Sequence, residues 1–288
     1  MFSSLKLGRL FGIDLYVHST FWLLPLFVLL SGAGSSAGEV TSEVLFVFAV
    51  FACVALHEFG HALAAASYGI RTRDITLYPV GGVASLEGMP EKPGQEIVVA
   101  LAGPAVNVVI ATGLLLGLSA GGLALPWERI SDPIELFVNR LLLANVALVL
   151  FNLLPAFPMD GGRVLRALLS TQMTRLRATE IAVTVGTVIA VLFFVGSIMI
   201  PQISLMAVAV VVWLMGQSEL ASLRMIAAQR EVERRARSFF GAPEPAPEYP
   251  RDPNVDLATR RFTGIAWDTA HGVWIQWVNG VPVRALSR

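Results

Sequence analysis

The chain has 288 residues, of which 55% are hydrophobic and 15% are charged, with a mean hydropathy of +0.67 and no formal net charge. Soluble domains carry about 25% charged residues, so this composition excludes an ordinary soluble protein. The balanced charge indicates neither an acidic nor a basic partner. The only cysteine, Cys53, excludes an intramolecular disulfide.

The N-terminal third of the sequence predicts a lead-in, two membrane spans and a hairpin. Residues 1–18 alternate apolar and polar side chains, which predicts a short interfacial strand or an amphipathic segment. A first span over about residues 19–30 is short, and a second covers about residues 43–68. In the loop 70–95, apolar residues alternate on both sides of Gly81-Gly82, which predicts a β-hairpin; a plain surface turn fits the local pattern equally well.

Four more spans follow, over about residues 96–120, 134–154, 178–200 and 204–220. The fourth span ends before Pro155, because proline lacks the amide donor that a helix needs. The sequence therefore predicts an all-α polytopic membrane protein with about six transmembrane helices, a small membrane-associated β-hairpin or sheet and a short C-terminal β meander. The expected domains are a transmembrane core over 1–222, a cytoplasmic helical extension over 223–240, a proline-rich linker over 241–259 and the meander over 260–288.

Lysine and arginine residues are unevenly distributed between the two sides of the predicted bundle. The N-terminus, the loop 70–95, the loop 155–177 and the segment 219–237 lie on one side and carry 2, 3, 4 and 5 of these residues, whereas the opposite loops carry only Arg129. By the positive-inside rule, the first side is cytoplasmic. We therefore expect a multi-pass protein of the cell (inner) membrane with both termini in the cytoplasm.

Three ionisable side chains interrupt the second span near its cytoplasmic end. His57 and His61 are four residues apart and lie on one helix face, where two imidazoles can hold one zinc ion. Glu58 lies one step round the helix and could take a proton from a zinc-bound water, whose pKa the metal lowers. The alternative is a polar seam in which these side chains only hydrogen-bond one another. The H-E-x-x-H pattern favours a metalloprotease site on the cytoplasmic side.

A catalytic zinc ion usually has a third protein ligand. Asp160 is the outstanding candidate, because it follows the fourth span at the depth of the two histidines and precedes Gly161-Gly162, which let the backbone pass close to another helix. A helix N-cap before residues 163–169 is an equally good local interpretation of Asp160.

Four motifs together resemble the site-2 protease family of intramembrane zinc metalloproteases, most closely its six-span archaeal and bacterial branch with the sporulation factor protease. The resemblance covers about residues 1–220. It implies one zinc ion per chain on His57, His61 and Asp160, Glu58 as general base, and Asn152 as a catalytic amide that holds the substrate or polarises its scissile carbonyl. It also implies that the Gly81-Gly82 hairpin pairs with an extended substrate strand. The motifs are His57-Glu58-Phe59-Gly60-His61, Gly81-Gly82, Ala102-Gly103-Pro104 to Asn107, and Asn152 to Gly162.

The leading functional hypothesis is a zinc endopeptidase that cuts within or near a transmembrane segment of another membrane protein, for which a tethered regulator such as an anti-sigma factor is one candidate. The alternatives are a membrane metal transporter or metal-binding protein that uses His57, His61 and Asp160, and an inactive member that binds transmembrane helices. The lipid bilayer is an expected partner. No nucleic acid is expected, because residues 260–288 contain only four arginines. The roles of His18 and Asn107, the oligomeric state and the role of the tail stay open.

Overall fold

The computed structural model describes residues 4–32, 34, 36–88, 90, 92–123, 126, 132–199, 203–240, 263–268, 273–278 and 281–287. Its internal contacts divide the chain into two units, 1–224 and 225–288. The first unit contains the helical bundle and a four-stranded sheet, and the second contains the end of the last helix and a three-stranded sheet.

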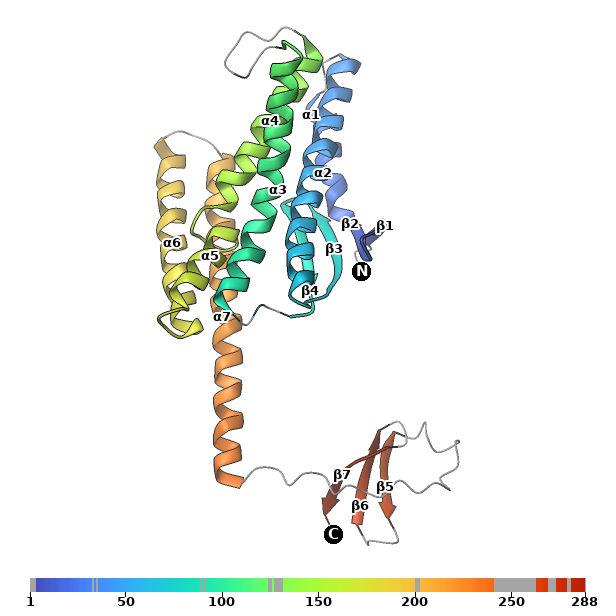
Figure 1. Ribbon diagram of the computed structural model, residues 1–288, viewed down its shortest axis with the longest axis vertical. Helices are drawn as coiled ribbons and strands as arrows, with labels where there is room; N and C mark the ends of the chain where they lie inside the picture. Colours follow the sequence, from blue (N-terminus) through green and yellow to red (C-terminus); the bar gives the residue numbers. More distant parts are fainter. Residues whose placement is uncertain are drawn as a thin grey trace. The chain divides into compact units, whose positions relative to one another are not determined.

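Within the described residues, five helices are long and apolar enough to cross a membrane. Each begins and ends within a few residues of a predicted span, apart from the last, which continues to Phe240 without a break. Figure 1 shows the first three of these helices lying side by side. The five are α2 (Ala37–Ser67), α3 (Pro93–Ala120), α4 (Pro133–Asn152), α6 (Arg175–Met199) and α7 (Ile203–Phe240).

The first predicted span differs from the others. Residues 19–31 form a short 3-10 turn, η1 (Ser19–Trp22), followed by α1 (Leu23–Ser31). Such a segment is too short to cross about 30 Å of hydrocarbon as a straight helix, because a helix rises about 1.5 Å per residue. The polytopic helical fold is confirmed, but with five long helices and one short apolar helix.

The predicted hairpin is part of a larger sheet, and its turn is at Pro79-Val80 rather than at Gly81-Gly82, which begin the second strand. It consists of β3 (Thr72–Tyr78) and β4 (Gly81–Leu86), and the N-terminal segment adds β1 (Ser4–Leu10) and β2 (Ile13–His18) in the order β1-β2-β3-β4. β2 and β3 are parallel, which is possible because α1 and α2 provide the long crossover that parallel strands need. β4 is an edge strand, so one side of its backbone lacks a strand partner within the described chain.

The sheet packs against α2, and this packing orients the helix. Ile75 in β3 contacts Phe59 and Ala62 of α2 in a buried apolar cluster, and Leu77 joins a second cluster with Val54 and Ala55. In the helical period, Phe59 lies about half a turn from His57 and His61, whose contacts with Asn107 and Val99 place them on the side of α2 that meets α3.

A short helix, α5 (Asp160–Leu169), begins at Asp160 and contacts both α3 and α6. Its first turn lies very close to the chain that leaves α4. A Cβ atom at Gly161 would lie 2.3 Å from the Leu153 carbonyl oxygen, and one at Gly162 would lie 2.7 Å from the Ala156 carbonyl carbon. The glycine pair does permit a close backbone approach, as predicted, but to the loop after α4 rather than to another helix.

The second unit contains the predicted meander. Its strands are β5 (Gly264–Asp268), β6 (Val273–Val278) and β7 (Val281–Ser287), and they form an antiparallel sheet in that order. The rings of Trp267 and Trp274 meet edge to face at 5.3 Å across β5 and β6. The predicted proline-rich linker, residues 241–259, lies outside the described residues, so the expected domain boundaries stay predictions.

We expect Gly161→Ala to lower stability, because the added methyl group would meet two backbone carbonyls that cannot rotate away. Overpacking of this kind costs about 1–3 kcal/mol. Thermal unfolding in detergent, followed by alkylation of the buried Cys53, measures the effect.

Gly113→Ala on α3 is the matched control, because a Cβ atom there would meet nothing within 4 Å. Alanine at a helix interior position is favoured over glycine by about 0.5–1 kcal/mol. An unfolding temperature for Gly161→Ala at or above that of the wild type would contradict the close approach.

Candidate metal centre

The two histidines of α2 point their Nε2 atoms at one another. The His57 and His61 side chains are 6% and 5% exposed, and their Nε2 atoms are 3.0 Å apart. Residues four apart share a helix face, and that face is buried against α3. The structure therefore brings two nitrogen ligands to one point inside the bundle.

Asp160 completes a triangle of ligand atoms. Its Oδ2 atom lies 3.2 Å from the Nε2 atom of His57 and 3.2 Å from that of His61, and its side chain is buried. With metal–ligand bonds of about 2.0–2.1 Å, two ligands of a tetrahedral zinc ion lie about 3.3 Å apart. The three atoms, which come from α2 and from the first residue of α5, are therefore spaced as zinc ligands are.

The other nitrogen of each imidazole is bound to an oxygen atom. His57 Nδ1 lies 2.6 Å from the Asn107 side-chain oxygen, and His61 Nδ1 lies 2.7 Å from the Val99 carbonyl oxygen. Both oxygens are carbonyl oxygens, which only accept. The Asn107 amide is oriented with its oxygen toward His57, because its nitrogen donates to Asn145 Oδ1 at 2.8 Å. Both imidazoles therefore carry their proton on Nδ1 and present a lone pair at Nε2.

This arrangement fits a cation. With the protons on Nδ1, the two Nε2 atoms and Asp160 Oδ2 are three proton acceptors that face one another without a proton between them. Asp160 Oδ2 is buried and has no hydrogen-bond donor among the described residues, although the two Nε2 atoms lie close to it. Buried acceptors without a donor are costly. A divalent cation at their centre satisfies all three.

Gly103 of α3 leaves the space for the two rings. A Cβ atom at this position would lie 2.2 Å from His61 Nε2 and 2.7 Å from His57 Nε2. Any other residue would therefore push into the imidazoles or into the centre of the ligand triangle. The small-residue stretch of α3 permits close helix packing, as predicted, and at Gly103 it also makes room for the ligands.

Glu58 lies between α2 and the edge strand of the sheet. Its side chain is half-buried, and a Cβ atom at Gly82 in β4 would lie 2.5 Å from its Cγ and 3.2 Å from its Oε1. A side chain at position 82 would therefore displace Glu58. Because residue 82 is glycine, the backbone of β4 can lie against Glu58, the residue that follows His57.

Asn152 is the last residue of α4 and is half-buried. The next residue, Leu153, lies against Gly161, beside Asp160. This places Asn152 at the end of the bundle that holds the metal ligands. Its catalytic role stays a prediction.

Two further residues have roles that the sequence left open. His18 lies at the end of β2, caps η1 through its contact with Thr20 and stacks on Tyr78 with ring centroids 4.8 Å apart. It therefore acts locally at the sheet. Asn107 contacts the candidate ligand His57 through its side-chain oxygen.

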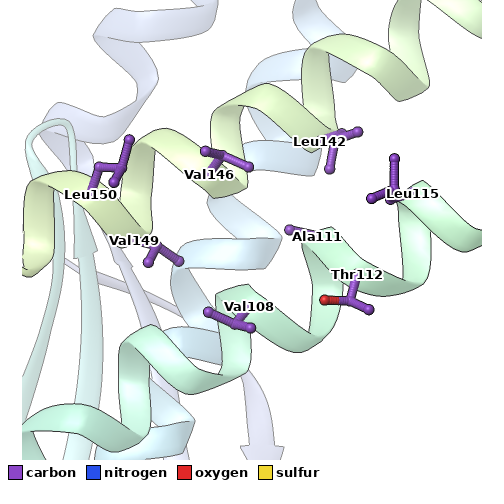
Figure 2. Close-up of a pocket in the computed structure, with 8 residues that line it drawn as sticks. All are labelled: Val108, Ala111, Thr112, Leu115, Leu142, Val146, Val149 and Leu150. Atoms are coloured by element: carbon purple, nitrogen blue, oxygen red, sulfur yellow. The ribbon is translucent and has the colours of Figure 1, made fainter. Parts of the chain in front are cut away.

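A groove of about 260 Å³ lies between α3 and α4, and it contains none of the predicted site residues. It is apolar apart from one threonine and has no titratable side chain, so it offers no groups for catalysis. Figure 2 shows its lining, in which Val108, Ala111, Thr112 and Leu115 of α3 face Leu142, Val146, Val149 and Leu150 of α4.

Comparison with known proteins gives one consistent result. The sequence model of Peptidase family M50 matches residues 45–193. A zinc metalloprotease of Methanocaldococcus jannaschii is 33% identical over 222 residues, which cover 75% of this chain and 60% of that protein. Stage IV sporulation protein FB of Bacillus subtilis is 27% identical over 162 residues, covering 56% of this chain and 49% of that protein. The match thus spans about half to three fifths of these curated relatives.

The fold also resembles a solved structure. The site-2 protease from Methanocaldococcus jannaschii superposes with a TM-score of 0.57 and 31% sequence identity, covering 76% of this chain and 95% of that one. The matched family region contains His57, His61, Gly103, Asn107 and Asp160, so all three candidate ligands lie within it.

We expect Gly103→Ala to abolish tight zinc binding, on the order of a 100-fold loss of affinity, because the methyl group would occupy the space between the ligand nitrogens. Competition against a chromogenic chelator in detergent measures the affinity. Gly117→Ala on the same helix is the control, since a Cβ atom there meets nothing within 4 Å. Equal zinc affinity in the two variants would contradict this placement of the rings.

Asn107→Leu should lower zinc affinity by about 10- to 100-fold, because His57 would lose the acceptor that fixes its ring and its tautomer. Asn139→Leu is the control; Asn139 is a buried amide on α4 that donates to the Glu135 carbonyl. The same chelator competition compares the two. If Asn139→Leu lowered the zinc affinity as much as Asn107→Leu, the effect would not be specific to the contact between Asn107 and His57.

Proposed function

Because the chain belongs to peptidase family M50, we propose that it is an intramembrane zinc metalloprotease that hydrolyses a peptide bond within or near a transmembrane segment of a membrane protein. The observation that carries the proposal is the buried triangle of His57 Nε2, His61 Nε2 and Asp160 Oδ2, whose edges are 3.0–3.2 Å. Three ligands leave a fourth position open, as in catalytic zinc sites. One zinc ion per chain is the stoichiometry supported by the one such cluster among the described residues.

A zinc ion held by His57, His61 and Asp160 would act as a Lewis acid and would lower the pKa of a bound water toward neutrality. Glu58 is the general base: its carboxylate accepts a proton from the attacking water and returns it to the leaving amine. Its place beside His57, and against β4 rather than in the ligand triangle, supports this role. Asn152 would donate its amide N–H to the scissile carbonyl, where negative charge develops.

The edge strand β4 supports a mode of substrate binding. A transmembrane helix hides its peptide bonds, so it must become extended before hydrolysis, and its freed backbone groups need partners in the membrane. The unpaired side of β4 offers such partners by strand addition. At Gly82 this backbone contacts Glu58, so a strand added to β4 would run past the general base.

The proposed location follows from the charges at the helix ends. The metal ligands lie near the C-terminal end of α2 and at the start of α5, the side where Arg163, Arg166, Arg175 and Arg177 gather. The positive-inside rule then places the site toward the cytoplasm of a cell-membrane protein. A single-span protein that tethers a regulator, such as an anti-sigma factor, is the proposed substrate class.

Glu58→Gln should keep zinc and lose cleavage by about 10²- to 10⁴-fold, since the metal ligands remain while the base is removed. Asp160→Ala should lose zinc as well as cleavage. The measurement pairs bound zinc with cleavage of fluorescent single-span peptides in reconstituted membranes. The control is Glu135→Gln, a half-buried glutamate in the first turn of α4 that lies outside the predicted site; this variant should behave as the wild type.

If Glu58→Gln cleaved at the wild-type rate, the general-base assignment would be wrong. Zinc flux into liposomes that depends on His61, without cleavage of any peptide in the panel, would favour a metal transporter instead.

A further inference from the structure

Four charged side chains, two of them buried and two partly exposed, form a group away from the metal ligands. Arg166 of α5 is 1% exposed and Glu96 of α3 is 6% exposed. Glu219 of α7 and Arg175 of α6 complete the group, so each of four helices contributes one residue. A buried charge is costly unless it is paired and hydrogen-bonded, so the buried Arg166 and Glu96 need the partners that this group provides.

The contacts form a connected network centred on Arg166. Its Nε donates to Glu96 Oε1 at 2.8 Å, and its Nη1 donates to Glu219 Oε1 at 2.7 Å. Arg175 Nη2 lies 3.1 Å from the second oxygen of Glu96. The Arg166 guanidinium also lies over the Phe157 ring, 5.1 Å from its centroid, so the loop before α5 covers it.

Stability alone does not explain such a network. Replacing a buried ion pair with apolar residues of similar size is often neutral or stabilising, because desolvation offsets the attraction between the charges. What a buried pair does provide is a fixed geometry, since neither partner can shift without leaving the other uncompensated. The question is which geometry this network fixes.

The network joins the two helices whose relative position sets the metal site. Arg166 lies on the ten-residue helix that begins at Asp160. Glu96 lies one turn before Val99, whose carbonyl oxygen accepts from His61 Nδ1, and two turns before Gly103, which makes room for both imidazoles. A rigid Arg166–Glu96 contact therefore fixes the third ligand relative to the other two.

We propose that Arg166 and Glu96 are positioning residues for the metal centre: their buried ion pair holds α5 against α3, so that Asp160 stays within bonding distance of a zinc ion on His57 and His61. Glu219 holds the other side of the same guanidinium and ties α7 to this arrangement. The inference rests on the proposed metal site.

The chain offers a matched control pair. Arg140 of α4 pairs with Glu43 of α2 through both guanidinium Nη atoms, and it also lies over an aromatic ring, that of Phe46. This pair joins two long helices but includes no residue of α5. The Arg140–Glu43 pair is more exposed than the Arg166–Glu96 pair, so it controls for the loss of an arginine–glutamate contact between helices, and the metal spectrum is needed to separate the loss of a buried charge from the loss of Asp160.

The test uses the full-length protein in detergent, with zinc affinity measured by chelator competition. Arg166→Met should lower the affinity by about 10- to 100-fold, as loss of outer-shell support does, whereas Arg140→Met should change it by less than about threefold. Adding Glu96→Gln to Arg166→Met should cause little further loss, because the two residues act through one contact. If Arg166→Met does not fold, Glu219→Gln replaces it, with an expected loss of about 3- to 10-fold.

Cobalt spectra separate loss of Asp160 from general loosening. With Co²⁺ in place of zinc, the visible spectrum of Arg166→Met should shift toward that of Asp160→Ala, while Arg140→Met should keep the wild-type spectrum. A folded Arg166→Met protein with wild-type affinity and spectrum would overturn the inference but leave the proposed function intact. A wild-type protein that binds no zinc would overturn both.

Discussion

The constraint on which this structure depends is the meeting of three proton acceptors at a nearly buried site. Two imidazole nitrogens and a carboxylate oxygen lie 3.0–3.2 Å apart and are almost fully buried. Without a cation, such an arrangement is unfavourable, because no donor compensates the lost solvation. The surrounding bundle must therefore hold these atoms against their own repulsion, which requires fixed rings, a fixed carboxylate and helices packed too tightly to relax.

Several features of the bundle meet these requirements. Hydrogen bonds to Asn107 and to the Val99 carbonyl fix the two rings, both from α3. Gly103 lets α3 approach them, and Gly161 lets α5 begin against the loop after α4, so that Asp160 reaches the rings. On the other side of α2, the sheet packs on Phe59 and brings Gly82 against Glu58. Short side chains thus occur where helices or strands must approach the site closely.

Features of the site that depend on residues close together in the sequence could be predicted, whereas those that depend on contacts between distant segments could not. His57 and His61 are local: their spacing alone places both on one helix face. Asp160 was only a candidate, because the local pattern also suited a helix N-cap. The N-cap interpretation was wrong, because Met159 is the N-cap and no side chain caps α5; Asp160 is the first residue of the helix and faces the imidazoles. The parallel pairing of β2 with β3 and the contact of Asn107 with His57 depend on how distant segments pack, and no local pattern reports that.

The buried polar residues outside the ligand set illustrate the same point. Asn107, Asn145, Glu96 and Arg166 are each nearly inaccessible, and in a membrane bundle such residues are usually interpreted as contacts that hold helices together. Here their partners lead back to the ligands: Asn145 orients Asn107, which orients His57, and Glu96 lies one turn before the acceptor for His61. Because lipid offers no alternative hydrogen-bond partners, each of these groups has few other ways to be satisfied. The low polarity that makes the site costly therefore also makes its geometry well determined.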